Sequence, residues 1–244
     1  MYCNYSKLFV YAEEKVKQFL EREWDNEEVK KVITSLRESA LKDVENKVEG
    51  VVPIPGEDAS KEELIEAIVN NVKWQIGINS KSGSLKELQG MIWKKGYDDG
   101  DIVGHVYDDV PAALEQWHSV EGQKVYIYSS GSVQAQKLLF GHTVSGDLLK
   151  YIDGHFDTAV GGKLETSSYK AIVEQIGCKP DEILFLTDIE NEAAAAREAG
   201  LHVALLSRPG NSSLSPSAVS DYPVLQSFDQ LAPSNKRKQE TQVP

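Results

Sequence analysis

The spacing of apolar residues changes once along the chain, near residue 96, and this change limits the folds that the sequence can adopt. Before it, apolar positions recur every three or four residues, as they do in amphipathic helices. After it, short runs of consecutive apolar residues alternate with helical segments. Such runs are typical of strands that helices cover on both faces of a parallel sheet. The sequence therefore predicts an all-helical module at residues 7–95 and an α/β core with a doubly wound parallel sheet at residues 96–232.

Two local signals divide the helical module. The proline-containing segment at residues 51–56 predicts a loop, because proline disfavours helix at its own position and at the residue before it. Ser60 is predicted to cap the next helix, with Glu63 completing a capping box three residues later.

The charge balance argues against two classes of partner. The chain has 26 Lys and Arg residues against 38 Asp and Glu residues, a formal net charge of −12. A field of this sign repels nucleic acid and anionic lipid surfaces. No apolar run approaches the roughly 18 residues of a membrane span, and the first six residues lack the features of a secretion signal. We therefore expect a cytoplasmic protein that binds neither nucleic acid nor membranes.

The cysteines and the C-terminal segment add to this expectation. Cys3 and Cys178 are too few for a disulfide framework and have no zinc-binding spacing, which suits a reducing compartment. Residues 233–244 are polar and are predicted to form a disordered tail. The basic triplet at residues 236–238 would also permit nuclear entry.

Hydroxyl groups follow the first predicted strand of the core. In an open parallel sheet, ligands bind beyond the carboxyl ends of the strands. Ser129 and Ser130 follow the strand predicted at residues 125–128 and precede a helix, where hydroxyls and free backbone N–H groups can hold an anion. Capping of that helix is the alternative interpretation.

An acid and a lysine complete the set of polar residues at the strand ends. Asp188 follows the strand predicted at residues 183–186 and is a reasonable Mg²⁺ ligand, although it could instead cap the next helix. Glu190 and Glu192 suit the first turn of that helix, where negative charge is favourable. Lys163 lies in a glycine-containing loop and offers a positive charge to a phosphate, with a solvated surface lysine as the alternative. A hydroxyl, a lysine and an acid at one rim can together stabilise a phosphoryl group.

Other catalytic classes lack their motifs. The histidines are scattered, with no Ser–His–acid order and no Gly-x-Ser-x-Gly turn around Ser130. No Gly-x-Gly-x-x-Gly follows a predicted strand, and no Walker loop is present. The sequence thus argues against a serine hydrolase, a dinucleotide-dependent enzyme and a nucleoside-triphosphatase.

Several stretches resemble the enolase-phosphatase E1 family of the haloacid dehalogenase superfamily. They include KVYIYSSGSVQAQKLLFGH at 124–142, DGHFDT at 153–158, ILFLTD at 183–188, VPIP at 52–55 and NVKWQ at 71–75. The similarity extends from about residue 8 to residue 231. It implies a haloacid dehalogenase-like α/β core with a helical cap.

The resemblance also implies an activity. Members of the family are Mg²⁺-dependent acireductone synthases of methionine salvage, which enolise and dephosphorylate 2,3-diketo-5-methylthiopentyl 1-phosphate. Carried over by position, Ser129 and Ser130 would hold the substrate phosphate, Lys163 would neutralise its charge and Asp188 would ligate Mg²⁺. The expected partner is therefore a small phosphorylated diketone, and we expect a monomer.

The first motif of the superfamily has no counterpart here. Its nucleophile is the first acid of an Asp-x-Asp/Glu pair at the end of an N-terminal strand that precedes the cap. Residues 8–12 already resemble the start of the cap, and residues 1–7 contain no acid. We therefore expect the first core strand and the nucleophile to be missing from these residues, with hydrolysis nearly abolished and Mg²⁺ affinity reduced. Family topology implies unpaired strand edges between the strands that end at Ser129 and Asp188.

Other acids are poor substitutes for that nucleophile. Asp108 and Asp109 precede a predicted helix start at Val110 and are interpreted as caps. Asp157 has a counterpart in the family in addition to the nucleophile.

Two hypotheses besides the enzyme stay open: a non-catalytic phosphate-binding or regulatory protein, and an unstable fragment without an independent role.

Overall fold

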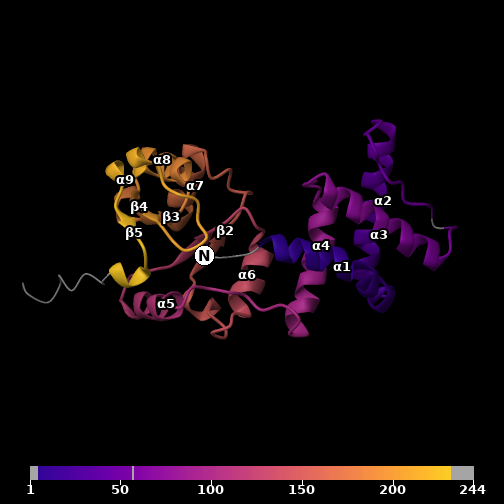
Figure 1. Ribbon diagram of the computed structural model, residues 1–244, viewed down its shortest axis with the longest axis horizontal. Helices are drawn as coiled ribbons and strands as arrows, with labels where there is room; N and C mark the ends of the chain where they lie inside the picture. The colour runs from indigo at the N-terminus through magenta and orange to yellow at the C-terminus, as the bar shows by residue number, and fades with distance from the viewer. Residues whose placement is uncertain (1–4, 57, 232–244) are drawn as a thin grey trace, which may run out of the picture. The chain divides into compact units, whose positions relative to one another are not determined.

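The computed structural model describes residues 5–56 and 58–231 (Figure 1). These residues divide into a helical unit that ends at Val103 and an α/β unit that begins at Gly104. The predicted tail at residues 233–244 and the segment before Tyr5 lie outside the described residues. Among the helices of the described residues, none is long and apolar enough to cross a lipid bilayer.

The helical unit follows the predicted helical spacing. Its described helices are α1 (Tyr5–Glu23), α2 (Glu27–Glu45), α3 (Lys61–Gly77) and α4 (Gly83–Asp98). Ser60 caps α3 and forms the predicted capping box with Glu63. The proline-containing segment between α2 and α3 is a loop, as predicted.

Buried amide groups, which the apolar pattern did not reveal, fix that loop. The Asn71 side chain is fully buried and donates a hydrogen bond of 2.6 Å to the Val52 carbonyl. Gln75 donates to the Asn71 side-chain oxygen at 2.7 Å and accepts from the Ser82 hydroxyl at 2.6 Å. These bonds compensate the burial of the amides.

The α/β unit alternates strands and helices. Its elements are α5 (Val110–Ser119), β1 (Tyr126–Tyr128), α6 (Val133–Gly141), η1 (Leu149–Tyr151), β2 (Gly154–Phe156), α7 (Thr166–Ile176), η2 (Pro180–Glu182), β3 (Leu184–Thr187), α8 (Glu190–Glu198), β4 (His202–Leu206), α9 (Pro216–Asp221), β5 (Val224–Leu225) and η3 (Phe228–Gln230). All strand pairs are parallel. In Figure 1, α7, α8 and α9 lie on one side of the strands and α5 and α6 on the other. The predicted α/β class with parallel strands is confirmed.

The parallel strands form two sheets instead of one. Strand β1 pairs with β2, and β3, β4 and β5 form a separate three-stranded sheet. Within the described chain, β1 and β3 thus each hydrogen-bond to a single neighbouring strand. Strands β1 and β3 are only partly buried, and Leu184 of β3 is 47% exposed, although continuous apolar strands normally lie covered on both faces. Within the described residues, β1 and β3 therefore each have one edge without a strand partner.

Tyr169 on α7 connects the two sheets. Its side chain is 1% exposed. Its ring meets the ring of Tyr128 from β1 edge to face, with centroids 5.7 Å apart, and the ring of Phe185 from β3 at 5.1 Å. Aromatic pairs favour this geometry. Helix α7 therefore holds β1 and β3 in one unit, although no ladder joins the two strands within the part of the chain that the structure describes.

Asp109 does not have the predicted capping role. Helix α5 begins at Val110, but the Asp109 side chain makes no capping hydrogen bond. Its carboxylate instead pairs with the Arg208 guanidinium at 2.5 Å and 3.0 Å, and accepts from the Phe228 N–H and the Ser227 hydroxyl. Burial alone would raise the pKa of Asp109, but the hydrogen bonds from Arg208, Phe228 and Ser227 lower it below its ordinary value.

Replacing Asp109 by Asn should lower the free energy of unfolding at pH 7 by about 3–5 kcal/mol, because Arg208 then stays buried without its counter-charge. A lowered carboxyl pKa stabilises the fold above the unfolded-state pKa of about 4, and that stability is lost as the pH falls through the folded-state pKa. The difference in unfolding free energy between the native protein and Asp109→Asn should therefore be smaller at pH 3 than at pH 7. Urea unfolding at pH 7 and pH 3 measures both effects.

Lys94→Ala is the matched control, because it breaks an exposed ion pair with Asp98 and should cost less than about 1 kcal/mol. A loss of similar size for both variants at pH 7 would contradict the assignment of Asp109 and Arg208 as a buried stabilising pair.

Candidate functional site

Lys163 lies between the ends of β1 and β3. Its Nζ is 5.8 Å from the ring centroid of Tyr128, the last residue of β1. It also donates to Glu192 Oε2 at 3.2 Å, and the same oxygen accepts from the hydroxyl of Thr187, the last residue of β3, at 2.6 Å. The lysine side chain is 25% exposed. The alternative of a solvated surface lysine is therefore wrong.

Ser129 and Ser130 directly follow β1 and do not cap the next helix. The N-cap of α6 is Ser132, whose hydroxyl accepts from the Ala135 N–H at 3.2 Å. The Ser129 hydroxyl accepts from the Gly131 N–H, and Ser130 is exposed. The alternative interpretation, that Ser129 or Ser130 caps the helix, is therefore wrong, because a different serine has this role.

Asp157 serves the local backbone. One carboxylate oxygen accepts from the Val133 N–H at the start of α6, at 3.0 Å, and the other accepts from the Ala159 N–H at 2.9 Å. These two bonds agree with the interpretation that Asp157 does not replace a nucleophile.

Asp188 follows β3, and one of its oxygens is held by an amide from a distant loop. Asn211 Nδ2 donates to Asp188 Oδ2 at 2.7 Å, while Asn211 Oδ1 accepts from the Arg208 N–H at 2.8 Å. The N-cap position of α8 belongs to Ile189, so Asp188 is not the cap. Sequence reasoning missed Asn211, because the loop after β4 has no periodic pattern that marks it.

Glu190 and Glu192 lie in the first turn of α8, as predicted, but each also has a specific partner. Glu192 is buried at 8% exposure beside Lys163. Glu190 accepts from the backbone N–H and the hydroxyl of Ser215, the N-cap of α9. Glu192 follows Asp188 by four residues, a spacing that could have indicated its position near the end of β3.

The residues present do not by themselves form a magnesium site. In the described chain, no group of three or more His, Cys, Asp or Glu side chains could hold a metal ion. Glu190 and Glu192 each accept two hydrogen bonds from protein groups, whereas Asp188 accepts one, from Asn211, and is therefore the best-placed metal ligand of the three. Mg²⁺ needs near-octahedral oxygen ligands and gives up its water reluctantly. A single carboxylate fits this ion poorly.

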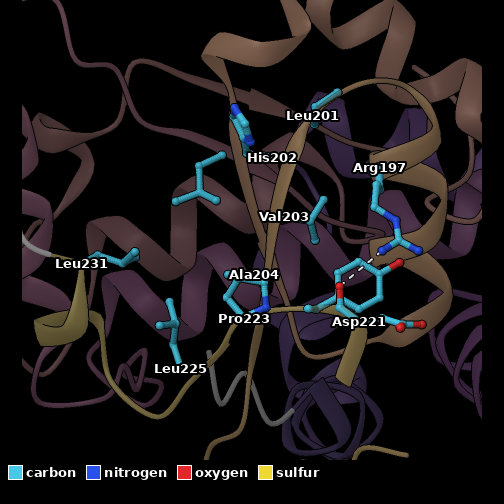
Figure 2. Close-up of a pocket in the computed structure, with 11 residues that line it drawn as sticks. Arg197, Leu201, His202, Val203, Ala204, Asp221, Pro223, Leu225 and Leu231 are labelled. Carbon is cyan, nitrogen blue, oxygen red and sulfur yellow. Dashed lines mark hydrogen bonds between the residues drawn. The ribbon is translucent and has the colours of Figure 1, made fainter. Parts of the chain in front are cut away.

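A pocket of about 450 Å³ lies elsewhere, on the three-stranded sheet (Figure 2). Its walls are mainly apolar and include Leu184, Val203 and Leu225. The Arg197 guanidinium at its edge donates to the Asp221 carbonyl at 3.3 Å. The predicted site residues do not line this pocket.

Removing the Glu192 carboxylate should destabilise the protein. Glu192→Ala leaves the Lys163 ammonium and the Thr187 hydroxyl without their shared acceptor, which should cost about 1–3 kcal/mol of unfolding free energy. Glu198→Ala on the same helix removes only an exposed acceptor of the Thr166 hydroxyl and should cost about 0.5 kcal/mol or less. Urea unfolding compares the two variants. Equal losses would show that the Lys163–Glu192 pair contributes nothing specific.

Comparison with known proteins places the chain in a family. Residues 10–200 match the model of the haloacid dehalogenase-like hydrolases. Enolase-phosphatase E1 from Anopheles gambiae is 54% identical over 233 residues, which cover 96% of this chain and 78% of the mosquito protein. Enolase-phosphatase E1 from Xenopus tropicalis is 47% identical over 232 residues, which cover 94% of this chain and 88% of the frog protein.

A solved structure shares the fold. The UTR4 protein of Saccharomyces cerevisiae superposes with a TM-score of 0.70 at 32% sequence identity, covering 91% of this chain and 89% of the yeast chain. The family model, the relatives and this structure agree with the parallel strands and flanking helices described above. The chain belongs to the enolase-phosphatase E1 family of haloacid dehalogenase-like hydrolases.

Proposed function

We propose that this chain binds the phosphate group of 2,3-diketo-5-methylthiopentyl 1-phosphate, the substrate that an enolase-phosphatase of methionine salvage converts into an acireductone. The position of Lys163 carries the proposal, because its ammonium lies between the strand ends that precede Ser129 and Asp188. The similarity to enolase-phosphatases supports the reaction class.

The proposed binding mode follows from charge and hydrogen bonding. Lys163 is partly buried, so its charge acts in a medium less polarisable than water and attracts a phosphate dianion more strongly. Glu192 pairs with the ammonium in the structure, and a bound phosphate would share that charge. The hydroxyls of Ser129 and Ser130, which follow β1, would donate to the phosphate oxygens.

We further propose that these residues alone hydrolyse the ester slowly. Near the strand ends, Asp157 accepts two backbone N–H groups and Asp188 is held by Asn211. Neither is available as an in-line nucleophile, and loss of a covalent nucleophile costs several powers of ten in rate. A strand between β1 and β3 that ends in Asp-x-Glu would pair both open edges and supply the attacking carboxylate and a second magnesium ligand. Asp188 would be the first such ligand.

Adding such a strand ahead of residue 1 should raise Mg²⁺-dependent phosphate release from the diketone phosphate by about 10³-fold or more over the 244-residue chain. The matched control carries the same added strand with Asn in place of its first Asp, and should be as slow as the chain alone. The rate of phosphate release is measured for the chain, the strand-extended protein and the Asn control. Comparable turnover by the chain with and without the strand would contradict the proposal.

Asp188→Asn, made in the strand-extended protein, should raise the Mg²⁺ concentration needed for half-maximal phosphate release about tenfold or more, because a neutral amide binds the cation more weakly than a carboxylate. Asp181→Asn, at an exposed acid of η2, should leave it unchanged. An unaltered Mg²⁺ dependence in Asp188→Asn would remove this residue from the proposed metal site.

A non-catalytic phosphate-binding or regulatory protein is the second candidate. Two features of the described residues favour it over the enzyme: the strands form two separate sheets, and Asp157 and Asp188 at the strand ends accept hydrogen bonds from protein groups. One measurement distinguishes the two candidates. A non-catalytic protein would bind phosphate but show no turnover even after the strand is added, whereas the enzyme would then release phosphate.

A further inference from the structure

Two tyrosine hydroxyls hold the loop that carries Lys163. The Tyr128 hydroxyl donates to the Gly161 carbonyl at 2.8 Å, and the Tyr169 hydroxyl donates to the Lys163 carbonyl at 2.6 Å. Tyr128 belongs to β1 and Tyr169 to α7, and their rings are in edge-to-face contact. The loop is thus attached to a strand and to a helix at carbonyls two residues apart.

The loop also lies very close to α7. Gly161 has φ +125°, a conformation that favours glycine. A Cβ at this position would lie 2.1 Å from the hydroxyl oxygen of Ser168, which is 1% exposed on α7. There is no room for a side chain at Gly161, which shows that the backbone of the loop lies directly against α7. The path of the loop is therefore constrained from both sides.

Both hydroxyls keep their protons at physiological pH. Burial raises the pKa of Tyr128 and of Tyr169, and the Glu192 carboxylate raises both further. A protonated phenol donates to a carbonyl, whereas a phenolate does not. The two hydroxyls therefore remain hydrogen-bond donors at physiological pH, where a phosphate monoester is mainly a dianion.

We propose that Tyr128 and Tyr169 are positioning residues for phosphate binding, which they support by fixing the backbone that presents the Lys163 ammonium at the strand ends. The inference rests on the proposed function. Each hydroxyl donates to a loop carbonyl, so neither acts on the phosphate directly. Binding a phosphate orders the lysine and its loop, which costs conformational entropy. A backbone that is already fixed has less freedom to lose, so the affinity for phosphate is higher.

Inorganic phosphate is the probe, titrated into the full chain by isothermal calorimetry. Tyr128→Phe and Tyr169→Phe keep the rings and remove only the hydroxyls, and each should raise the Kd for phosphate about threefold to tenfold, as expected for the loss of one hydrogen bond. Lys163→Ala should raise the Kd about tenfold or more. In the Lys163→Ala background, Tyr169→Phe should change the residual Kd less than about twofold, because the tyrosine acts through the lysine.

Tyr222→Phe is the matched control, since Tyr222 is a buried tyrosine of the same unit that packs against Arg197, and it should leave the Kd unchanged. Native-like binding by both Tyr128→Phe and Tyr169→Phe, with weak binding by Lys163→Ala, would overturn the positioning role and leave the proposed function intact. Equal effects of Tyr169→Phe with and without Lys163 would also overturn it. Native-like binding by Lys163→Ala, or no binding by the native chain, would contradict the proposed function itself.

Amide hydrogen exchange provides a second readout if a variant is destabilised. Exchange at residues 161–163 should accelerate in Tyr128→Phe and Tyr169→Phe while exchange in β4 stays as in the native chain. Uniform acceleration across the α/β unit would assign the hydroxyls a purely global stabilising role and refute the inference.

Discussion

The contact of Tyr169 with both sheets is the interaction on which the rest of the α/β unit depends. Within the described residues no ladder of hydrogen bonds joins β1 to β3, so helix packing has to hold the two sheets together. Tyr169 does this from α7, with Tyr128 on one side and Phe185 on the other. Its hydroxyl also reaches the Lys163 carbonyl. One buried side chain thus links the core of the unit to its candidate site.

The chemistry of the site follows from this arrangement. The ends of β1 and β3 carry polar residues, and Lys163 connects them through the ring of Tyr128 and through Glu192. Glu192 offsets the charge of the partly buried lysine, which stabilises the ammonium when no ligand is bound. We propose that a phosphate binds beside it. Asp188 is oriented separately, by Asn211. We infer that the arrangement suits phosphate binding better than metal binding, because no group of three or more His, Cys, Asp or Glu side chains in the described residues could hold a metal ion.

Local patterns predicted the parts of this fold that depend on neighbours in sequence. The apolar runs located β1, β3 and β4, and the Ser60 capping box marked the start of α3. Strands β2 and β5 have three and two residues and no long apolar run, so periodicity could not reveal them. The partner of Asp109 lies 99 residues away, and that of Lys163 lies 29 residues away. Such pairs are set by tertiary packing, which explains why the capping role expected for Asp109 was wrong.

We propose that the ends of β1 and β3 form one phosphate-binding rim around Lys163. Backbone amide chemical shifts of the isotopically labelled chain, recorded during a titration with inorganic phosphate, test it most directly. The largest shift changes should fall at residues 129–133, 161–165 and 187–192. Changes concentrated at the apolar pocket around Leu184 and Leu225, with none in those three segments, would contradict it.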